Sequence, residues 1–458
     1  MRIACVQLRA RDVTEADRGL EEAVEAAAEA ARRADLVVLP EATYPAYVLH
    51  DAGPYLDRKG YERGRAAFAG VASREKTWIA VGLVRPEGDA LFNSAILFDP
   101  GGRETARADK AFLWHFDSRW FRPGIPSEAV PLPWGTTGMF VCADARMVEV
   151  PRRLAVTGAR LLLDPTALVL SPTGTNAQVE YLLAARAWEN GAFLAVANKC
   201  GVEGGIASYA GRSAIYRPNG QRVAEASPDA PQTIVAEVDP AAATGPPVAR
   251  DPRGYPELSA PLDSLPIAEV LSRPPPSKPL RVAMLSGKTV WDRAVAELAP
   301  DVAIRAGGGG LPEVFFMSEG VGPQSGGDPV PGTLVPAGDA LIGLLAGDRG
   351  LVPEEVRVQM LRGASVVVWG TADVGVPEFV ARTRADENRV FLVTFAGDGT
   401  WSVYGPSGAP LGSGPTPGIR ATLVELPLAL AWMKEMAPGT DVVRGRTPSH
   451  FDSLAQGS

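Results

Sequence analysis

Three residues in the first third of the chain combine a reactive side chain with the border of an apolar segment. Glu41 follows the apolar run 36–40, Lys110 precedes the aromatic-rich run 111–116, and Cys142 closes the run 139–142. Ligand and catalytic sites of α/β proteins gather at the carboxyl ends of strands, where such side chains can meet. A carboxylate, an ammonium and a thiol in one place can act as general base, oxyanion partner and nucleophile.

Each of these residues also has an ordinary interpretation when it is taken alone. A glutamate after a strand is usually a solvated loop residue or a charge at a helix N-terminus. Lys110 can form a surface salt bridge with its neighbour Asp109. A single cysteine such as Cys142 is more often a small core residue than a nucleophile. The argument for chemistry therefore depends on finding all three together.

The elements that must position these residues alternate between strand and helix. Apolar or alternating runs predict strands at 2–8, 35–40, 78–84, 94–98, 139–142, 160–164, 193–197 and 213–217. Amphipathic spacing predicts helices at 15–33, 61–76, 149–157 and 177–190. This alternation favours a layered α/β fold, and the proline-rich run 263–279 predicts a stiff linker after it.

The second half of the chain echoes the first half in the same order, which is typical of an internal repeat. The run 280–285 echoes 1–6, 384–388 echoes 186–190, and 404–408 echoes 216–220. The pairs Gly158-Ala159 and Gly363-Ala364 match each other, and counting back from them places Gly347 opposite Cys142. Gly307 stands where Glu41 stands in the first half. We interpret the chain as a duplicated unit whose second copy lost its reactive residues. Two unrelated α/β domains are the alternative.

Five segments in the first half together resemble the nitrilase superfamily, whose signature is a Glu–Lys–Cys triad in this chain order. The segments are Leu39-Pro40-Glu41, Lys110 with Trp120-Phe121-Arg122-Pro123-Gly124, Cys142-Ala143-Asp144-Ala145-Arg146, 185–190 and 211–215. The resemblance covers residues 1 to about 260. It implies an α/β fold with an αββα sandwich as catalytic domain (1–262), followed by the linker (263–279) and a degenerate, non-catalytic copy (280–458). Members of the superfamily commonly pair as dimers, so the second copy is expected to form an intrachain pseudo-dimer with the first.

The resemblance also implies a reaction that needs no metal and no organic cofactor. Cys142 would attack the substrate, Glu41 would move the protons, and Lys110 with the Ala143 N–H would hold the oxyanion. Many members carry a further glutamate before the aromatic-Phe-x-Pro-Gly segment, and here Asp117 stands in its place. We expect Asp117, Ala143 and Tyr47 to contact the substrate.

The residues after the nucleophile indicate the branch of the superfamily. Nitrilases of the superfamily usually have Cys-Trp-Glu, whereas this chain has Cys142-Ala143-Asp144 as in the amidase and carbamoylase branches. We therefore expect a small amide or N-carbamoyl substrate. Nitrile hydrolysis and a catalytically inactive scaffold remain alternatives. The run 286–289 resembles the end of a phosphate loop, but Val282 stands where its first glycine is needed.

Composition excludes several other classes of function. The net charge is −8 and no basic run occurs, which argues against nucleic acid as a partner. Three cysteines in 458 residues argue against a disulfide framework and favour a reducing compartment. The chain starts on a strand-like run and contains no run of 18 apolar residues, so we expect a cytoplasmic protein that does not contact membranes.

Overall fold

The computed structural model describes most of the chain, namely residues 1–50, 52–251, 253–285, 298–306, 312–318, 322–325, 332–371, 375–415, 419 and 421–456. It divides into two compact units. Unit 1 comprises Met1–Pro247 together with Ala437–Thr440, and unit 2 comprises Val248–Met436 together with Asp441–Ser458. The predictions at Gly307 and at 286–289 lie outside the described residues.

Unit 1 is built on two β-sheets. The first has the strand order β11-β10-β1-β2-β3-β4-β5, with β14 also paired to β1, and the second has the order β13-β12-β9-β8-β7-β6. The strands are β1 (Arg2–Arg9), β2 (Leu36–Val38), β3 (Trp78–Glu87), β4 (Ala90–Phe98), β5 (Glu104–Asp109), β6 (Val130–Leu132), β7 (Gly135–Met139), β8 (Leu161–Pro165), β9 (Phe193–Ala197), β10 (Lys199–Glu203), β11 (Ala207–Ala210), β12 (Ala214–Tyr216), β13 (Arg222–Glu225) and β14 (Gln232–Glu237). The central strands β1, β2 and β3 run parallel, as do β7, β8 and β9.

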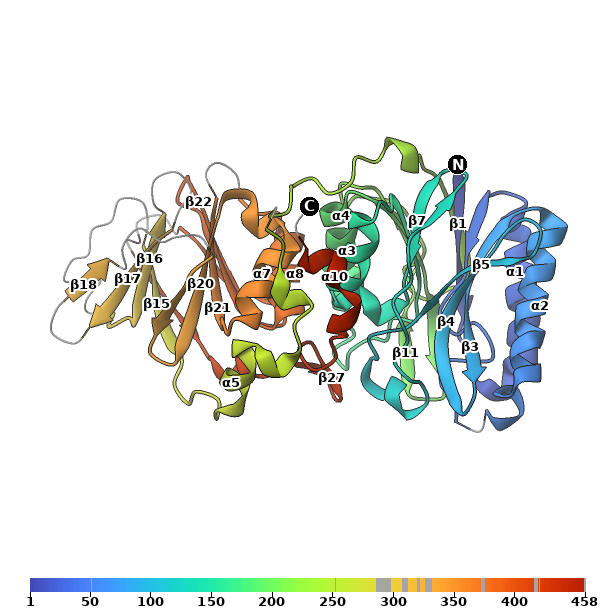
Figure 1. Ribbon diagram of the computed structural model, residues 1–458, viewed down its shortest axis with the longest axis horizontal. Coiled ribbons are helices and arrows are strands. Elements are labelled where there is room, and N and C mark those ends of the chain that lie inside the picture. Colours follow the sequence, from blue (N-terminus) through green and yellow to red (C-terminus); the bar gives the residue numbers. More distant parts are fainter. Residues whose placement is uncertain are drawn as a thin grey trace. The chain divides into compact units, whose positions relative to one another are not determined.

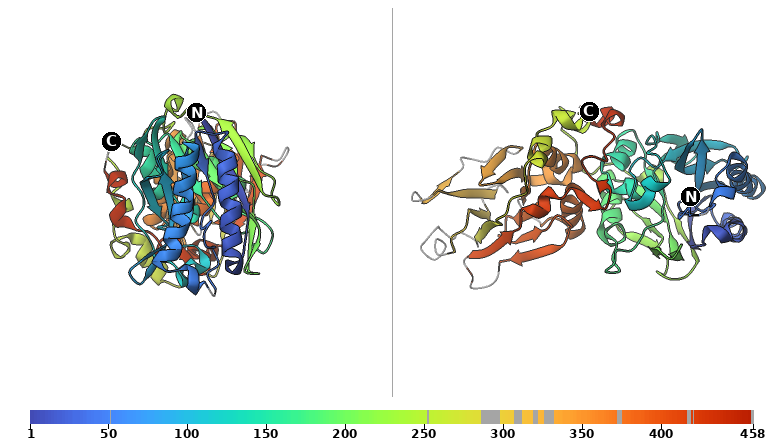
Figure 2. Two further views of the ribbon diagram at one scale, coloured as in Figure 1. Left: turned by 90° about the vertical axis from the view of Figure 1, so that its right-hand side faces the viewer. Right: turned by 90° about the horizontal axis from the view of Figure 1, so that it is seen from below.

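Helices cover the outer faces of both sheets. The helices α1 (Ala16–Ala31) and α2 (Arg58–Glu75) pack on the first sheet, and α3 (Glu149–Val156) and α4 (Leu183–Asn190) pack on the second (Figures 1 and 2). Strands β2 and β3 of the first sheet contact β8 of the second. Unit 1 is therefore the four-layer αββα sandwich that the sequence predicts. None of the described helices is long and apolar enough to cross a membrane.

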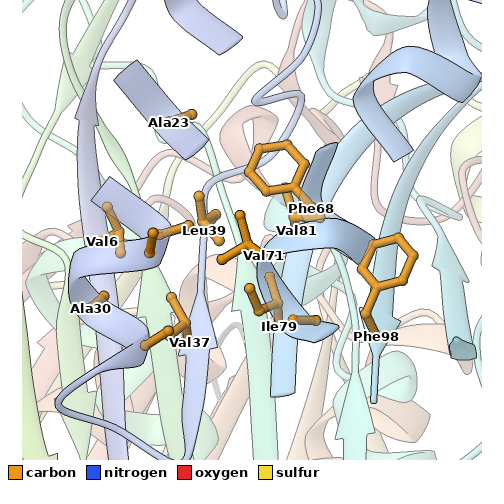
Figure 3. Close-up of a cluster of buried hydrophobic side chains, with 14 of the residues drawn as sticks. Val6, Ala23, Ala30, Val37, Leu39, Phe68, Val71, Ile79, Val81 and Phe98 are labelled. Carbon is orange, nitrogen blue, oxygen red and sulfur yellow. The ribbon is translucent and has the colours of Figure 1, made fainter. Parts of the chain in front are cut away.

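An extended apolar core of unit 1 lies between the first sheet and its two helices (Figure 3). Small residues such as Ala23 and Ala30 on α1 let this helix approach the sheet closely, while Phe68 and Val71 on α2 fill the remaining space. Fully burying a side chain of the size of Phe68 contributes roughly 1.5–3 kcal/mol. This rigid half-sandwich carries the loops that follow β2 and β5.

Unit 2 repeats the strand order of the second sheet. Its six-stranded sheet is β24-β23-β22-β21-β20-β19, and a five-stranded sheet has the order β25-β15-β16-β17-β18. The strands are β15 (Leu280–Leu285), β16 (Val302–Ala306), β17 (Pro312–Ser318), β18 (Gly322–Ser325), β19 (Leu334–Ala337), β20 (Ala340–Ala346), β21 (Val366–Thr371), β22 (Phe391–Ala396), β23 (Trp401–Tyr404), β24 (Pro410–Gly414) and β25 (Ala421–Leu426). The helix α7 (Pro353–Leu361) lies between β20 and β21 in the chain, and α8 (Glu378–Asn388) lies between β21 and β22.

The segment expected to be a plain linker is partly folded onto unit 2. A short helix, α5 (Pro266–Ser272), buries Ile267, and the Trp432 indole N–H donates to the Val270 carbonyl at 3.2 Å. The preceding segment also packs there, because Arg250 pairs with Glu354 at 2.8 Å. The boundary between the units consequently falls at Pro247, ahead of the proline-rich run rather than inside it.

Candidate active site

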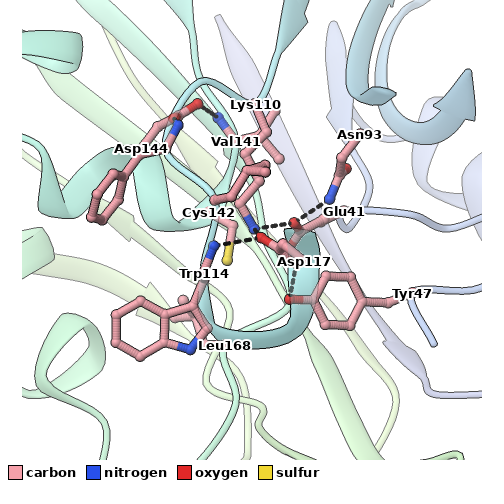
Figure 4. Close-up of polar contacts among 12 residues, drawn as sticks. Glu41, Tyr47, Asn93, Lys110, Trp114, Asp117, Val141, Cys142, Asp144 and Leu168 are labelled. Carbon is pink, nitrogen blue, oxygen red and sulfur yellow. Dashed lines mark hydrogen bonds and ion pairs between the residues drawn. The ribbon is translucent and has the colours of Figure 1, made fainter. Parts of the chain in front are cut away.

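Glu41, Lys110 and Cys142 come from the loops after β2, β5 and β7 and lie together in one site (Figure 4). Their exposed fractions are 0%, 1% and 4%, so the site is shielded from bulk water. The expectation that Cys142 ends a strand is wrong. The strand β7 ends at Met139, and Cys142 begins a one-turn 3₁₀ helix (Cys142–Arg146) with a left-handed φ of 55°. A non-glycine residue in this conformation is strained and is typical of functional sites.

The Glu41 carboxylate is held from two sides. Its Oε1 accepts hydrogen bonds from Lys110 Nζ at 2.7 Å and from Asn93 Nδ2 at 2.6 Å. The backbone at Glu41 crosses strand β3 so closely that a Cβ on Gly82 would lie 2.5 Å from Glu41 Cα. Burial raises the pKa of Glu41 above its ordinary value, against the lowering effect of the Lys110 charge. A carboxyl group with a raised pKa is suited to accept and return a proton.

Lys110 lies between two carboxylates. Its Nζ is 2.7 Å from Asp117 Oδ2 as well as 2.7 Å from Glu41. Burial alone would lower the pKa of Lys110, but the neighbouring carboxylates of Asp117 and Glu41 raise it well above its ordinary value. The lysine is therefore a fixed positive charge rather than a base. Asp117 reaches it despite being one methylene shorter than glutamate.

Asp117 and Tyr47 contact each other rather than standing free toward a substrate. The Tyr47 hydroxyl donates to Asp117 Oδ1 at 2.5 Å, and the Trp114 N–H donates to Asp117 Oδ2 at 2.7 Å. The Tyr47 ring centroid lies 5.6 Å from Lys110 Nζ. Both residues expected to contact the substrate thus belong to the polar network around Lys110.

The backbone of Cys142 is fixed at both of its polar atoms. The Cys142 N–H donates to Asp164 Oδ1 at 2.8 Å, and Gln178 Nε2 donates to the Cys142 carbonyl at 3.0 Å. Gln178 begins a π-helical turn (Gln178–Leu182) ahead of α4, and such turns are frequent at functional sites. Burial and the Glu41 charge raise the pKa of the Cys142 thiol, against Lys110 and Thr166, which lower it. Burial thus favours the neutral thiol over the thiolate, and the side chain of Cys142 interacts with that of Glu41.

The Ala143 backbone N–H has no hydrogen-bond partner among the described residues. It lies on the first turn after the nucleophile, where an N–H can hold an oxyanion. Asp144 stabilises the same turn. It accepts from the Val141 N–H at 3.1 Å and from the Ala111 and Phe112 N–H groups at 3.0 and 2.8 Å. Asp144 therefore joins the Cys142 turn to the Lys110 loop.

Sequence reasoning missed three residues that hold this site. Asn93, Asp164 and Gln178 each hydrogen-bond to a proposed catalytic residue. Asn93 and Asp164 gave a usable signal, because each is a polar residue in or at the end of an apolar strand. Gln178 gave none, since a glutamine near a predicted helix start is ordinary.

The close-up of the site also contains the apolar side chains of Trp114 and Leu168 (Figure 4). The Arg146 guanidinium stacks 4.5 Å from the centre of the Trp114 ring. Tyr44 lies in the core under α2. Within the described part of the chain, no group of three or more His, Cys, Asp or Glu side chains could hold a metal ion.

Comparisons with known proteins find relatives of this chain among one family of enzymes. The carbon-nitrogen hydrolase family model matches residues 2–245. A hydrolase in the pqqF 5' region of Pseudomonas protegens is 33% identical over 201 residues, which cover 43% of this chain and 69% of that protein. A nitrilase from Pyrococcus abyssi is 28% identical over 244 residues, covering 52% and 90%. A mutant of the amidase from Nesterenkonia sp. AN1, solved with acrylamide added at its active-site cysteine, is 31% identical with a TM-score of 0.49, covering 52% and 93%.

The chain belongs to the carbon–nitrogen hydrolase family, within the nitrilase superfamily. The resemblance drawn from the five segments is thereby confirmed, and the protein is an enzyme of the carbon–nitrogen hydrolase class.

Proposed function

We propose that this protein hydrolyses small neutral amides or N-carbamoyl compounds through a thioester on Cys142. The observation that carries the proposal is the convergence of Cys142, Glu41 and Lys110 in one buried site, with Lys110 Nζ 2.7 Å from Glu41 Oε1. A buried nucleophile with an adjacent carboxylate and a fixed cation meets the requirements of acyl transfer.

The proposed reaction proceeds in two stages. Glu41 accepts the thiol proton as Cys142 Sγ bonds to the substrate carbonyl carbon, and Lys110 with the Ala143 N–H holds the oxyanion. Collapse breaks the C–N bond, and Glu41 returns the proton to the leaving nitrogen, so that ammonia or an amine departs. Water then attacks the thioester while Glu41 accepts its proton, and the acid and the free thiol are released.

The charges of the site favour a neutral substrate. Glu41, Lys110 and Asp117 already pair with one another, and Trp114 and Leu168 add apolar surface to the site. A charged substrate would need an additional buried counter-charge, because an unpaired buried charge is costly. Amide hydrolysis is also the activity in the names of a deaminated glutathione amidase from Yersinia enterocolitica and an omega-amidase from Saccharomyces cerevisiae, which are 29% and 26% identical.

The test is ammonia release from a panel of neutral amides, neutral N-carbamoyl compounds and nitriles. We expect release from one of the first two classes by the wild type and none by Cys142→Ala. Cys200→Ala is the matched control, because Cys200 is equally buried but lies on β10, and it should retain activity. Release from nitriles alone would favour the nitrilase alternative. A folded wild type with no release and an unreactive Cys142 would favour the inactive scaffold.

We also propose that unit 2 is a decayed copy of unit 1. The order of its six-stranded sheet matches that of β13-β12-β9-β8-β7-β6. Gly347 follows β20 as Cys142 follows β7, and their φ angles are 57° and 55°. The glycine therefore keeps the backbone of a nucleophile turn without its thiol.

Side-chain contacts support the same correspondence. In α4, Arg186 Nε donates at 2.6 Å to the carbonyl of Ala145, three residues after Cys142. In α8, Arg384 Nε donates at 3.4 Å to the carbonyl of Gly350, three residues after Gly347. Each arginine also pairs with a glutamate three residues later, Glu189 or Glu387. Two unrelated domains have no reason to share these contacts. We extend the proposal to an intrachain pseudo-dimer, in which the second copy takes the role of a partner subunit.

A further inference from the structure

The loop that carries Asp117 is strained and depends on outside support. Its residue His115 has a left-handed φ of 48°, which is unfavourable for a non-glycine residue and persists only where neighbours hold it. The Trp114 N–H within this loop donates to Asp117 Oδ2, the same oxygen that lies 2.7 Å from Lys110 Nζ. Any shift of the backbone at 113–115 therefore moves the carboxylate that positions the lysine.

The support comes from the short segment Ala437–Thr440, which lies far away in the sequence but belongs to unit 1. Thr440 Oγ1 accepts a hydrogen bond from the His115 N–H at 2.6 Å across a separation of 325 residues. The same hydroxyl donates to the Leu113 carbonyl at 3.4 Å. One side chain thus holds the peptides on both sides of Trp114.

Thr440 is well placed for this task. Its side chain is 1% exposed, so water does not compete for the two hydrogen bonds. The bond to His115 is short, and a β-branched side chain such as threonine has little rotamer freedom. Without the hydroxyl, the His115 N–H would be a buried donor with no partner, which is unfavourable.

We propose that Thr440 is a positioning residue for the active site, acting through His115, Trp114 and Asp117 on Lys110. The proposal rests on the function proposed above and gives the late part of the chain a role in it. The segment that contains Thr440 lies, in sequence, inside the span of the proposed second copy and yet belongs to the catalytic unit, so a correctly placed lysine needs this late part of the chain. Thr440 also holds the backbone on both sides of Trp114, which is drawn with Cys142 and Asp117 in Figure 4.

The test compares Thr440→Val, which keeps the shape but removes the hydroxyl, with Thr440→Ser, which keeps the hydroxyl. In Thr440→Val we expect kcat to fall about tenfold with little change in KM, since loss of one hydrogen bond to a positioned group acts on the transition state. Thr440→Ser should restore most of the rate. Thr383→Val is the matched control, because Thr383 is also fully buried and donates to a carbonyl, but lies on α8.

A second measurement follows the protection of the loop backbone and does not depend on enzyme activity. Hydrogen exchange of the peptide containing His115 should be faster in Thr440→Val than in the wild type and unchanged in Thr440→Ser. Unchanged exchange, or faster exchange with unchanged kcat, would overturn the positioning role. An equal loss of kcat in Thr383→Val would also overturn it, as a general effect of stability. If the wild type released no ammonia from any compound, the proposed function would fail. Faster exchange in Thr440→Val would then still show that the Thr440 hydroxyl stabilises the loop.

Discussion

At the scale of single residues, Asp117 decides whether Lys110 is a usable oxyanion partner. We expect Asp117→Asn to lower kcat/KM on the order of 100-fold, because the lysine loses one of two carboxylates and turns toward Glu41. Ammonia release in the wild type and the variant measures this. Asp89→Asn, in the exposed turn between β3 and β4, is the control and should retain full activity. Equal rates for Asp117→Asn and the wild type would mean that Asp117 is dispensable.

Asp144 should make stability depend on pH. Burial raises its pKa to about 7 from an ordinary 3.8, although three backbone N–H groups oppose this. A carboxyl group with a raised pKa in the folded state contributes stability below the unfolded pKa, and this contribution is lost as the pH rises through 7. The contribution is about 1.4 kcal/mol for each unit of pKa difference.

The matching variant is Asp144→Asn, which cannot titrate but loses the acceptor for the Val141 N–H. It should be less stable than the wild type by about 1–3 kcal/mol at pH 4. The difference should shrink as the pH rises from 4 to 8. Urea unfolding of both proteins at several pH values measures the free energy of unfolding. A difference that stays constant across this range would contradict the raised pKa of Asp144.

At the scale of elements, the site depends on how closely the Glu41 loop crosses β3. A methyl group on Gly82 would collide with backbone atoms of Pro40 and Glu41, which cannot move independently of the base. We expect Gly82→Ala to destabilise the protein by about 1–3 kcal/mol and to reduce kcat as well. Thermal unfolding and ammonia release check both effects.

The control is Gly70→Ala on α2, where a Cβ would meet nothing within 4 Å. This change should leave activity unaffected and raise stability by about 0.5–1 kcal/mol, since alanine is favoured over glycine inside a helix. If Gly82→Ala behaved like Gly70→Ala, the close crossing at Glu41 would have no role in holding the base.

The elements were predictable from sequence to different degrees. Apolar and amphipathic runs predicted α1 to α4 and the strands β1, β2, β3, β4, β8, β9 and β12 of unit 1, but missed β5, β6, β10, β11, β13 and β14. The resemblance to the nitrilase superfamily brought Glu41, Lys110 and Cys142 together. The start of a new turn at Cys142 was not predictable, since an apolar run gives no sign of where a strand stops. Thr440 was also out of reach, because its contact with His115 spans 325 residues and depends on the final packing.

At the scale of the whole molecule, the pseudo-dimer proposal predicts how the activity per chain depends on the protein concentration. If the second copy takes the role of a partner subunit, both parts of the pair are covalently linked and cannot separate on dilution. We expect the activity per chain to stay constant from micromolar to nanomolar protein. Activity that fell on dilution and returned on reconcentration would show that a second chain is required.

If unit 2 is a decayed copy of unit 1, as proposed, its sheet bears on whether a second nucleophile could return. Strand pairing puts Trp369 on β21 where Asp164 stands on β8, and the Trp369 indole N–H donates to the Gly347 carbonyl at 2.8 Å. In unit 1, the Asp164 carboxylate accepts the hydrogen bond of the Cys142 N–H. A cysteine introduced at position 347 would have the Trp369 indole at the equivalent place instead. A cysteine at position 347 would thus need at least a second change, at Trp369, before its backbone could be held as that of Cys142 is.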